Sequence, residues 1–120
     1  MGTNMEGQIY KVIKNHIPAF HEPIILKKGD KVTIGREFTE DPDWPNWIEC
    51  KNKEGMKGWV PKQYLKIDGR TGIALRPYSA NELSVKEGNE IIALKFENGW
   101  AWSKNYTCEY GWVPIRNIKI

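Results

Sequence analysis

The sequence has few of the residues that would support catalysis, a metal centre or a disulfide scaffold. Only two cysteines and two histidines occur among 120 residues, and the cysteines lack Cys-x-x-Cys spacing. Two cysteines are too few to crosslink a small secreted domain, and this spacing does not predict a zinc site. No Ser, His and Asp arrangement and no glycine-rich phosphate-binding pattern is present. We therefore predict a protein that is not an enzyme, with reduced thiols, no cofactor and no metal.

Long apolar runs and a strong excess of one charge are also missing. No run approaches the ~18 apolar residues that cross a bilayer. Lys and Arg exceed Asp and Glu by 18 − 15 = +3, which gives no reason to expect a polyanionic partner. Residues 1–8 contain no basic segment followed by an apolar one, so no export signal is predicted. We expect a cytoplasmic protein without a membrane partner.

Aromatic residues are abundant, and most of the tryptophans lie in an internal repeat. The chain contains six Trp, five Tyr and three Phe. Residues 47–67 superimpose on residues 100–120 at a constant shift of 53, so Gly-Trp-Val-Pro occurs at 58–61 and again at 111–114. A repeat of this length indicates a duplicated structural unit.

A second matching stretch lies upstream at a different shift and locates an insertion. Residues 26–32 match 85–91 at a shift of 59. The difference of six residues indicates an insertion in the first copy, inside the acidic stretch 35–46. We predict two domains, 1–67 and 68–120, the first with a longer first loop and the inserted acidic loop.

Each copy has the pattern of short strands joined by tight turns. Asn98-Gly99 lies between strand-like runs and is typical of a two-residue hairpin turn. Pro61 and Pro114 should end strands, because proline cannot donate to a β-ladder. The segment 68–71 between the copies can reach only about 14 Å. We expect an all-β fold of two small barrels held together by this short linker.

The second copy resembles the Src-homology-3 (SH3) family. Ala-Leu-Arg-Pro-Tyr at 74–78 resembles the family's Ala-Leu-Tyr-Asp-Tyr, and residues 81–89 resemble its acidic Asp-Glu-Leu-Ser-Phe-x-x-Gly-Asp. Trp100 resembles the groove tryptophan, and 111–114 resemble Gly-Tyr-Val-Pro. The first copy is similar from 26 to 67. The resemblance implies two tandem five-stranded SH3-like barrels, each with an aromatic groove for a polyproline-II peptide and an acidic loop for a basic residue of that peptide.

The resemblance also implies ligand-binding residues in both copies. They are Tyr78, Trp100, Trp112, Pro114 and Glu82 in the second copy, and Trp47, Trp59, Pro61 and Tyr64 in the first. Strand alternation places these tryptophans on outward faces, with small and aliphatic residues such as Ala101 and Val113 inside. The copies depart from the family where Arg76 replaces the first signature tyrosine and Asn117 replaces the tyrosine after the proline. His16 or Phe20 could replace the signature tyrosines of the first copy.

These features favour a non-catalytic module that binds a protein or peptide, with a proline-rich or basic segment as the candidate ligand. The acidic insertion beside Trp47 could hold a ligand Arg or Lys. Three alternatives stay open: single-stranded nucleic-acid binding through exposed aromatic rings, a structural role with the rings buried at interfaces, and a cell-wall-binding bacterial SH3 variant, which the missing export signal disfavours. Mixed charges disfavour nucleic acid. The oligomeric state is left open.

Overall fold

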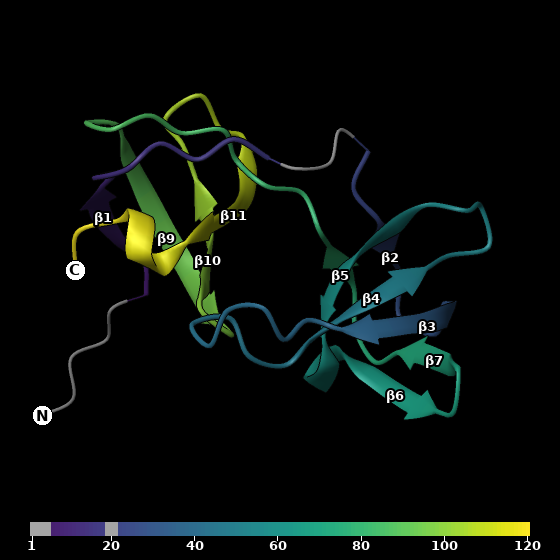
Figure 1. Cartoon of the computed structure of the whole chain (residues 1–120). Helices are drawn as coiled ribbons and strands as arrows, with labels where there is room; N and C mark the ends of the chain where they lie inside the picture. Colours follow the sequence, from purple (N-terminus) through teal and green to yellow (C-terminus); the bar gives the residue numbers. More distant parts are fainter. Residues whose placement is uncertain (1–5, 19–21) are drawn as a thin grey trace, which may run out of the picture. The chain divides into compact units, whose positions relative to one another are not determined.

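Short β-strands are the main elements of the structure. The computed structural model describes residues 6–18 and 22–120, and Figure 1 shows their path. The all-β class predicted from the sequence is confirmed. The strands are β1 (Gln8–Lys11), β2 (Ile25–Leu26), β3 (Lys31–Glu37), β4 (Trp47–Lys51), β5 (Lys57–Pro61), β6 (Leu65–Asp68), β7 (Thr71–Ala74), β8 (Tyr78–Ser79), β9 (Glu90–Glu97), β10 (Trp100–Lys104) and β11 (Tyr110–Pro114); the 3-10 turns are η1 (Lys62–Tyr64) and η2 (Ile115–Asn117).

The strands form three antiparallel sheets. One has the order β1-β9-β10-β11, one pairs β2 with β8, and the largest has the order β5-β4-β3-β7-β6. None of these sheets closes on itself, so two closed five-stranded barrels stay a prediction. No helix in the described part of the chain is long and apolar enough to cross a membrane.

Packing divides the chain into two compact units. Within the described residues, unit 1 consists of 6–18 together with 82–120, and unit 2 consists of 22–81. Unit 2 is therefore inserted into unit 1 along the chain. These spatial units do not coincide with the sequence segments 1–67 and 68–120, because the opening segment of each copy packs with the other copy.

The pairing of β1 and β7 shows how the copies are interleaved. β1, from the first copy, pairs with β9 of the second, and Tyr10 lies opposite Ile91. β7, from the second copy, pairs with β3 of the first, and Ile73 lies opposite Lys31 (Figure 1). We call this reciprocal arrangement the strand exchange.

The segment 68–71, predicted as a linker between barrels, is instead a hairpin turn within unit 2. Asp68 pairs with Thr71 across the turn, and Gly69 has a φ of 60°. Positive φ at the first central residue is required by the two-residue turns that join twisted antiparallel strands, and glycine adopts it without steric cost. The turn holds β7 on β6 and so keeps the start of the second copy on the sheet of the first.

The two exchanged segments occupy equivalent positions. His16 bridges to Val85 in unit 1, and Tyr78 pairs with Leu26 in unit 2. Val85 and Leu26 are themselves related by the shift of 59, so His16 is the counterpart of Tyr78.

Three residues earlier in each exchanged segment, backbone hydrogen bonds to η2 and η1 show the same equivalence. The amide of Ile13 donates to the Asn117 carbonyl, and the amide of Leu75 donates to the Tyr64 carbonyl. Asn117 and Tyr64 are related by the shift of 53. The residues that follow, Lys14 in unit 1 and Arg76 in unit 2, are therefore counterparts.

The core of unit 1 joins residues from both of its chain segments. Ala101 and Val113 are fully buried, as the strand alternation predicted, and the Ser103 hydroxyl, also buried, donates to the Ala101 carbonyl. Burying a large aliphatic side chain contributes about 1.5–3 kcal/mol, so Val12 ties the opening segment to this core. The cluster consists of Tyr10, Val12, Leu83, Val85, Ile91, Ala93, Ala101, Val113 and Ile118.

Candidate functional site

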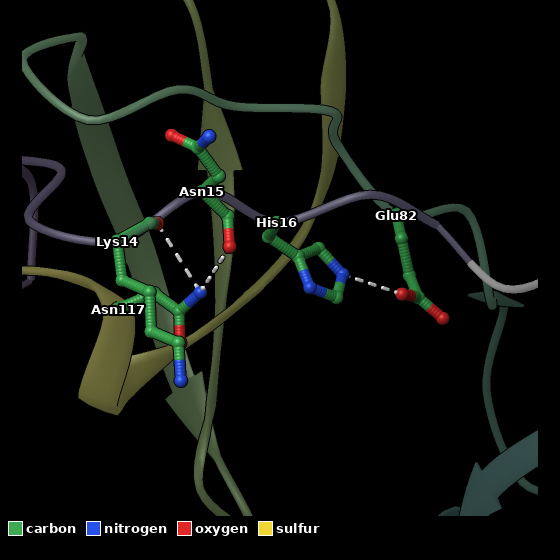
Figure 2. Close-up of polar contacts among 5 residues, drawn as sticks. All are labelled: Lys14, Asn15, His16, Glu82 and Asn117. Carbon is green, nitrogen blue, oxygen red and sulfur yellow. Dashed lines mark hydrogen bonds and ion pairs between the residues drawn. The ribbon is translucent and has the colours of Figure 1, made fainter.

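In unit 1, three separate segments bring together an imidazole, a carboxylate and an indole. Nε2 of His16 lies 2.7 Å from Oε1 of Glu82, and both side chains are about one-sixth exposed, at 16% and 18%. The His16 ring meets the Trp100 ring edge-on, with centroids 5.4 Å apart. Figure 2 shows the His16 side chain directed at Glu82. We call His16, Glu82 and Trp100 the unit 1 site.

Asn117 fixes the backbone that carries His16. Its amide nitrogen donates to the carbonyls of Lys14 and Asn15, at 3.2 and 3.1 Å, and the residue is 5% exposed (Figure 2). A buried amide with two carbonyl partners is a rigid clamp, because leaving those groups unpaired would cost about 1–3 kcal/mol each. The residue that replaces the family's tyrosine thus positions a loop and offers no ring to a ligand.

Unit 2 gathers aromatic residues at the equivalent place. The rings of Tyr64 and Tyr78 meet edge-on with centroids 5.4 Å apart, and the Tyr78 hydroxyl donates to the Trp59 carbonyl at 2.7 Å. The guanidinium carbon of Arg76 lies 4.1 Å from the centre of the Tyr64 ring. We call Arg76, Tyr64 and Tyr78 the unit 2 site; Trp47 and Pro61 lie opposite each other on the adjoining strands β4 and β5.

The inserted loop of unit 2 packs on Trp59. The Phe38 ring lies edge-on to Trp59 at 5.3 Å and is 6.0 Å from Trp44, while the Arg36 guanidinium lies 5.0 Å from the Trp59 ring. A guanidinium of the chain itself therefore makes the cation–π contact that a basic ligand residue would make at Trp59.

Two carboxylates of the inserted acidic loop are already paired with cations of the chain. Glu40 pairs with Arg36 at 2.6 Å, and Glu37 pairs with Lys62 at 3.0 Å. The pKa of Glu40 is lowered from its usual value because the Thr39 backbone amide and the Arg36 guanidinium donate to its carboxylate. These contacts occupy part of the acidic loop that the sequence suggested for a ligand Arg or Lys.

The strand exchange divides the predicted ligand residues differently from the sequence copies. Trp100, Trp112, Pro114 and Glu82 stay together in unit 1, with Trp100 opposite Pro114 and Glu82 bridging to Trp112. Tyr78 does not join them; it lies in unit 2 with Trp47, Trp59, Pro61 and Tyr64. His16 takes its place in unit 1, whereas Phe20 lies outside the described residues.

The expectation that the tryptophans face solvent is wrong for two of them. Trp47 is 5% exposed and Trp112 is 4% exposed. The Trp112 ring meets the Trp102 ring edge-on at 5.3 Å, and the Trp112 carbonyl accepts a hydrogen bond from the Leu83 amide. Trp59, Trp100 and Trp102 keep intermediate exposure.

Comparison with known proteins identifies the class. Residues 9–68 match the variant SH3 domain family, and this match covers half of the chain, so the protein belongs to that family. The matched range takes 9–18 from unit 1 and 22–68 from unit 2, so the family pattern follows the sequence copy and not the spatial unit. Membership makes the chain a protein-interaction domain of a kind that is generally non-catalytic.

A curated relative extends this similarity along the chain. The actin cytoskeleton-regulatory complex protein sla1 of Sclerotinia sclerotiorum is 23% identical over 123 aligned residues, which cover 93% of this chain and 10% of that protein. The chain thus spans about a tenth of the length of this relative. No solved structure matches.

Proposed function

We propose that the chain is a tandem pair of SH3-like domains that binds a peptide segment of another protein, and that unit 1 recognises a basic residue of that segment. The contact of His16 with Glu82 beside Trp100 carries this proposal. His16 contacts only Oε1 of Glu82, so the other carboxylate oxygen can pair with a ligand Arg or Lys while the partly exposed Trp100 ring provides a cation–π contact.

The contrast with unit 2 supports the assignment to unit 1. The shift of 59 puts Pro23 at the position of Glu82, so unit 2 has no carboxylate there. The counterpart of Trp100 at the shift of 53 is Trp47, which is only 5% exposed, and Trp59 is already contacted by Phe38 and Arg36. A basic residue therefore finds a carboxylate and an indole together in unit 1.

The tandem arrangement is supported by the repeat and by the extent of the sla1 match, which is not confined to residues 9–68. That relative is described as a regulator of the actin cytoskeleton. We propose a cytoplasmic adaptor role, with cytoskeletal regulators as the proteins in which to look for the peptide. A proline-rich segment remains the proposed ligand type for unit 1, on the resemblance of Trp100 to the groove tryptophan; Pro114, opposite Trp100, is fully buried and supports the strand beneath it.

Fluorescence anisotropy with the full chain tests this proposal. The probes are two labelled proline-rich peptides that differ at one position, Arg or Gln. Replacing Glu82 with Gln should weaken the Arg peptide about fivefold, the upper range for a partly exposed ion pair. Trp100→Ala should weaken it further, and Glu87→Gln, an exposed carboxylate of the same unit, serves as the matched control.

The proposal requires a specific pattern of peptide affinities in these titrations. The Arg peptide must bind more tightly than the Gln peptide, and Glu82→Gln must remove that difference while Glu87→Gln leaves it. Equal binding of the two peptides to the unmodified chain would contradict the assignment. If Trp100→Ala unfolds unit 1, as judged by circular dichroism, the Glu82→Gln result alone decides.

A further inference from the structure

Arg76 is an exposed cation held in place by an aromatic ring. Its guanidinium carbon lies 4.1 Å from the centre of the Tyr64 ring, within the range of a cation–π contact. Tyr64 itself is only 4% exposed and also packs against Tyr78. At this place the surface of unit 2 therefore presents a guanidinium and not a flat tyrosine ring.

Arg76 forms no ion pair with a carboxylate anywhere in residues 6–18 and 22–120. In the acidic insertion, Glu37 and Glu40 pair instead with Lys62 and Arg36. A guanidinium has five N–H donors in a planar fork that matches both oxygens of a carboxylate. Stacking on a ring reduces the side-chain freedom that such a contact would otherwise have to restrict.

From these contacts we propose that unit 2 binds a carboxylate-bearing peptide segment through Arg76. The carboxylate belongs to an Asp or Glu side chain or to a peptide C-terminus, since both have the same chemistry. This inference rests on the proposed function, that the chain binds peptides, and adds that its two units recognise residues of opposite charge.

The equivalent position of unit 1 provides a matched control. Lys14 is the counterpart of Arg76, but the counterpart of Tyr64 is Asn117, whose amide is bonded to the carbonyls of Lys14 and Asn15. Lys14 therefore has no ring equivalent to Tyr64 on which to stack. A point charge on a flexible stem is also a poorer match for a planar carboxylate than a guanidinium. Reversing the charge at residue 14 should leave carboxylate binding unchanged.

The test uses anisotropy titrations of the full chain with four labelled proline-containing peptides. Three amidated peptides carry Glu, Gln or Arg at one internal position, and the fourth has Gln with a free C-terminus. We expect the unmodified chain to bind the Glu peptide about fivefold more tightly than the Gln peptide. The peptide with the free C-terminus shows whether unit 2 binds a terminal carboxylate as well as a side-chain carboxylate.

The variants Arg76→Glu and Lys14→Glu decide whether Arg76 is responsible. Arg76→Glu should abolish the preference for Glu over Gln, and Lys14→Glu should preserve it. The preference should also shrink when salt is raised from about 50 to about 500 mM, because exposed charges are screened. Arg76 and Lys14 are both exposed, so both variants should stay folded, as judged by circular dichroism, with Arg76→Glu losing only its contact with the Tyr64 ring.

Several results would overturn the inference. Equal affinity for the Glu and Gln peptides would do so, and so would loss of the preference in Lys14→Glu alone. If the Arg peptide binds through Glu82 while no carboxylate preference appears, only this inference fails. If none of the four peptides binds, the proposed function fails with it.

Discussion

A pair of engineered cysteines can test the strand exchange directly. Val12 lies opposite Ile118 across an antiparallel bridge. The pair is enclosed by two backbone hydrogen bonds, from Ile13 N to Asn117 O and from Lys119 N to Lys11 O. Pairs enclosed in this way are the non-hydrogen-bonded kind, with Cα atoms about 4.5 Å apart. Disulfides span about 4.4–6.8 Å, so Val12→Cys with Ile118→Cys should close spontaneously under mild oxidation.

The size of the stabilisation follows from the length of the loop. Closing a loop of roughly one hundred residues removes about 4–5 kcal/mol of unfolded-state entropy in the chain-entropy model. Both native side chains are buried, and trimming them costs about 1–3 kcal/mol. The oxidised variant should therefore gain about 2 kcal/mol over the parent and lose the gain on reduction. Thermal unfolding followed by circular dichroism measures both states, with Cys108→Ser included to prevent competing pairs.

The control pair assumes that each copy keeps its own opening strand. In that arrangement Val12 would lie opposite Leu65, because Leu65 and Ile118 are related by the shift of 53. Intact mass and non-reducing electrophoresis show which pair closes. Efficient closure of Val12→Cys with Leu65→Cys, and failure of the pair with Ile118→Cys, would refute the exchange. A disulfide-linked dimer would show instead that the opening strands are exchanged between two chains.

Three further predictions concern single residues. Burial raises the pKa of the Cys50 thiol to about 12, so at pH 8 a thiol reagent should label only the exposed Cys108 until denaturant is added. Because the folded state holds the Cys50 proton more tightly than the unfolded state, the associated stability is lost as the pH rises above the ordinary thiol value towards 12; rapid labelling of both thiols in the folded chain would contradict this. Asn117→Ala should lower the unfolding free energy by about 2 kcal/mol, measured by urea titration, since it leaves two carbonyls without their donor; an unchanged midpoint would show that water replaces it. Gly58→Ala should destabilise unit 2 by about 1–3 kcal/mol, because the new Cβ would lie 2.5 Å from Cγ2 of Ile24; unfolding at the parent temperature would refute the predicted clash.

The features that could be predicted from the sequence are those set by neighbouring residues. Asn98 and Gly99 adopt φ values of 50° and 88°, as the predicted hairpin turn requires. The expected strand ends also appear, since β5 ends at Pro61 and β11 ends at Pro114. These features depend on the steric limits of the residues involved and need no information about distant partners.

The strand exchange could not be predicted in the same way, because two similar sheets compete for each opening strand. Val12 lies opposite Ile118, and Ala74 occupies the equivalent position opposite Leu65. The pattern of apolar side chains therefore does not show whether an opening strand pairs within its own copy or with the other copy. The local signal is Gly69, because a glycine at the first central position is typical of a two-residue hairpin turn, whereas the repeat predicts a linker at 68–71. The unit 1 site depended on the exchange, so the role of His16 beside Glu82 was missed.

The discontinuity of unit 1 has a consequence for how the protein is made. Residues 22–81 contain all of unit 2, so this unit can form as soon as that stretch has left the ribosome. Gln8, by contrast, pairs with Ala93, which is translated some 85 positions later, or about 4–17 s at 5–20 residues per second. During synthesis β1, which is partly apolar, has no partner strand until β9 has been made. A nascent chain stalled before β9 is therefore the state most exposed to capture by chaperones or by another nascent copy.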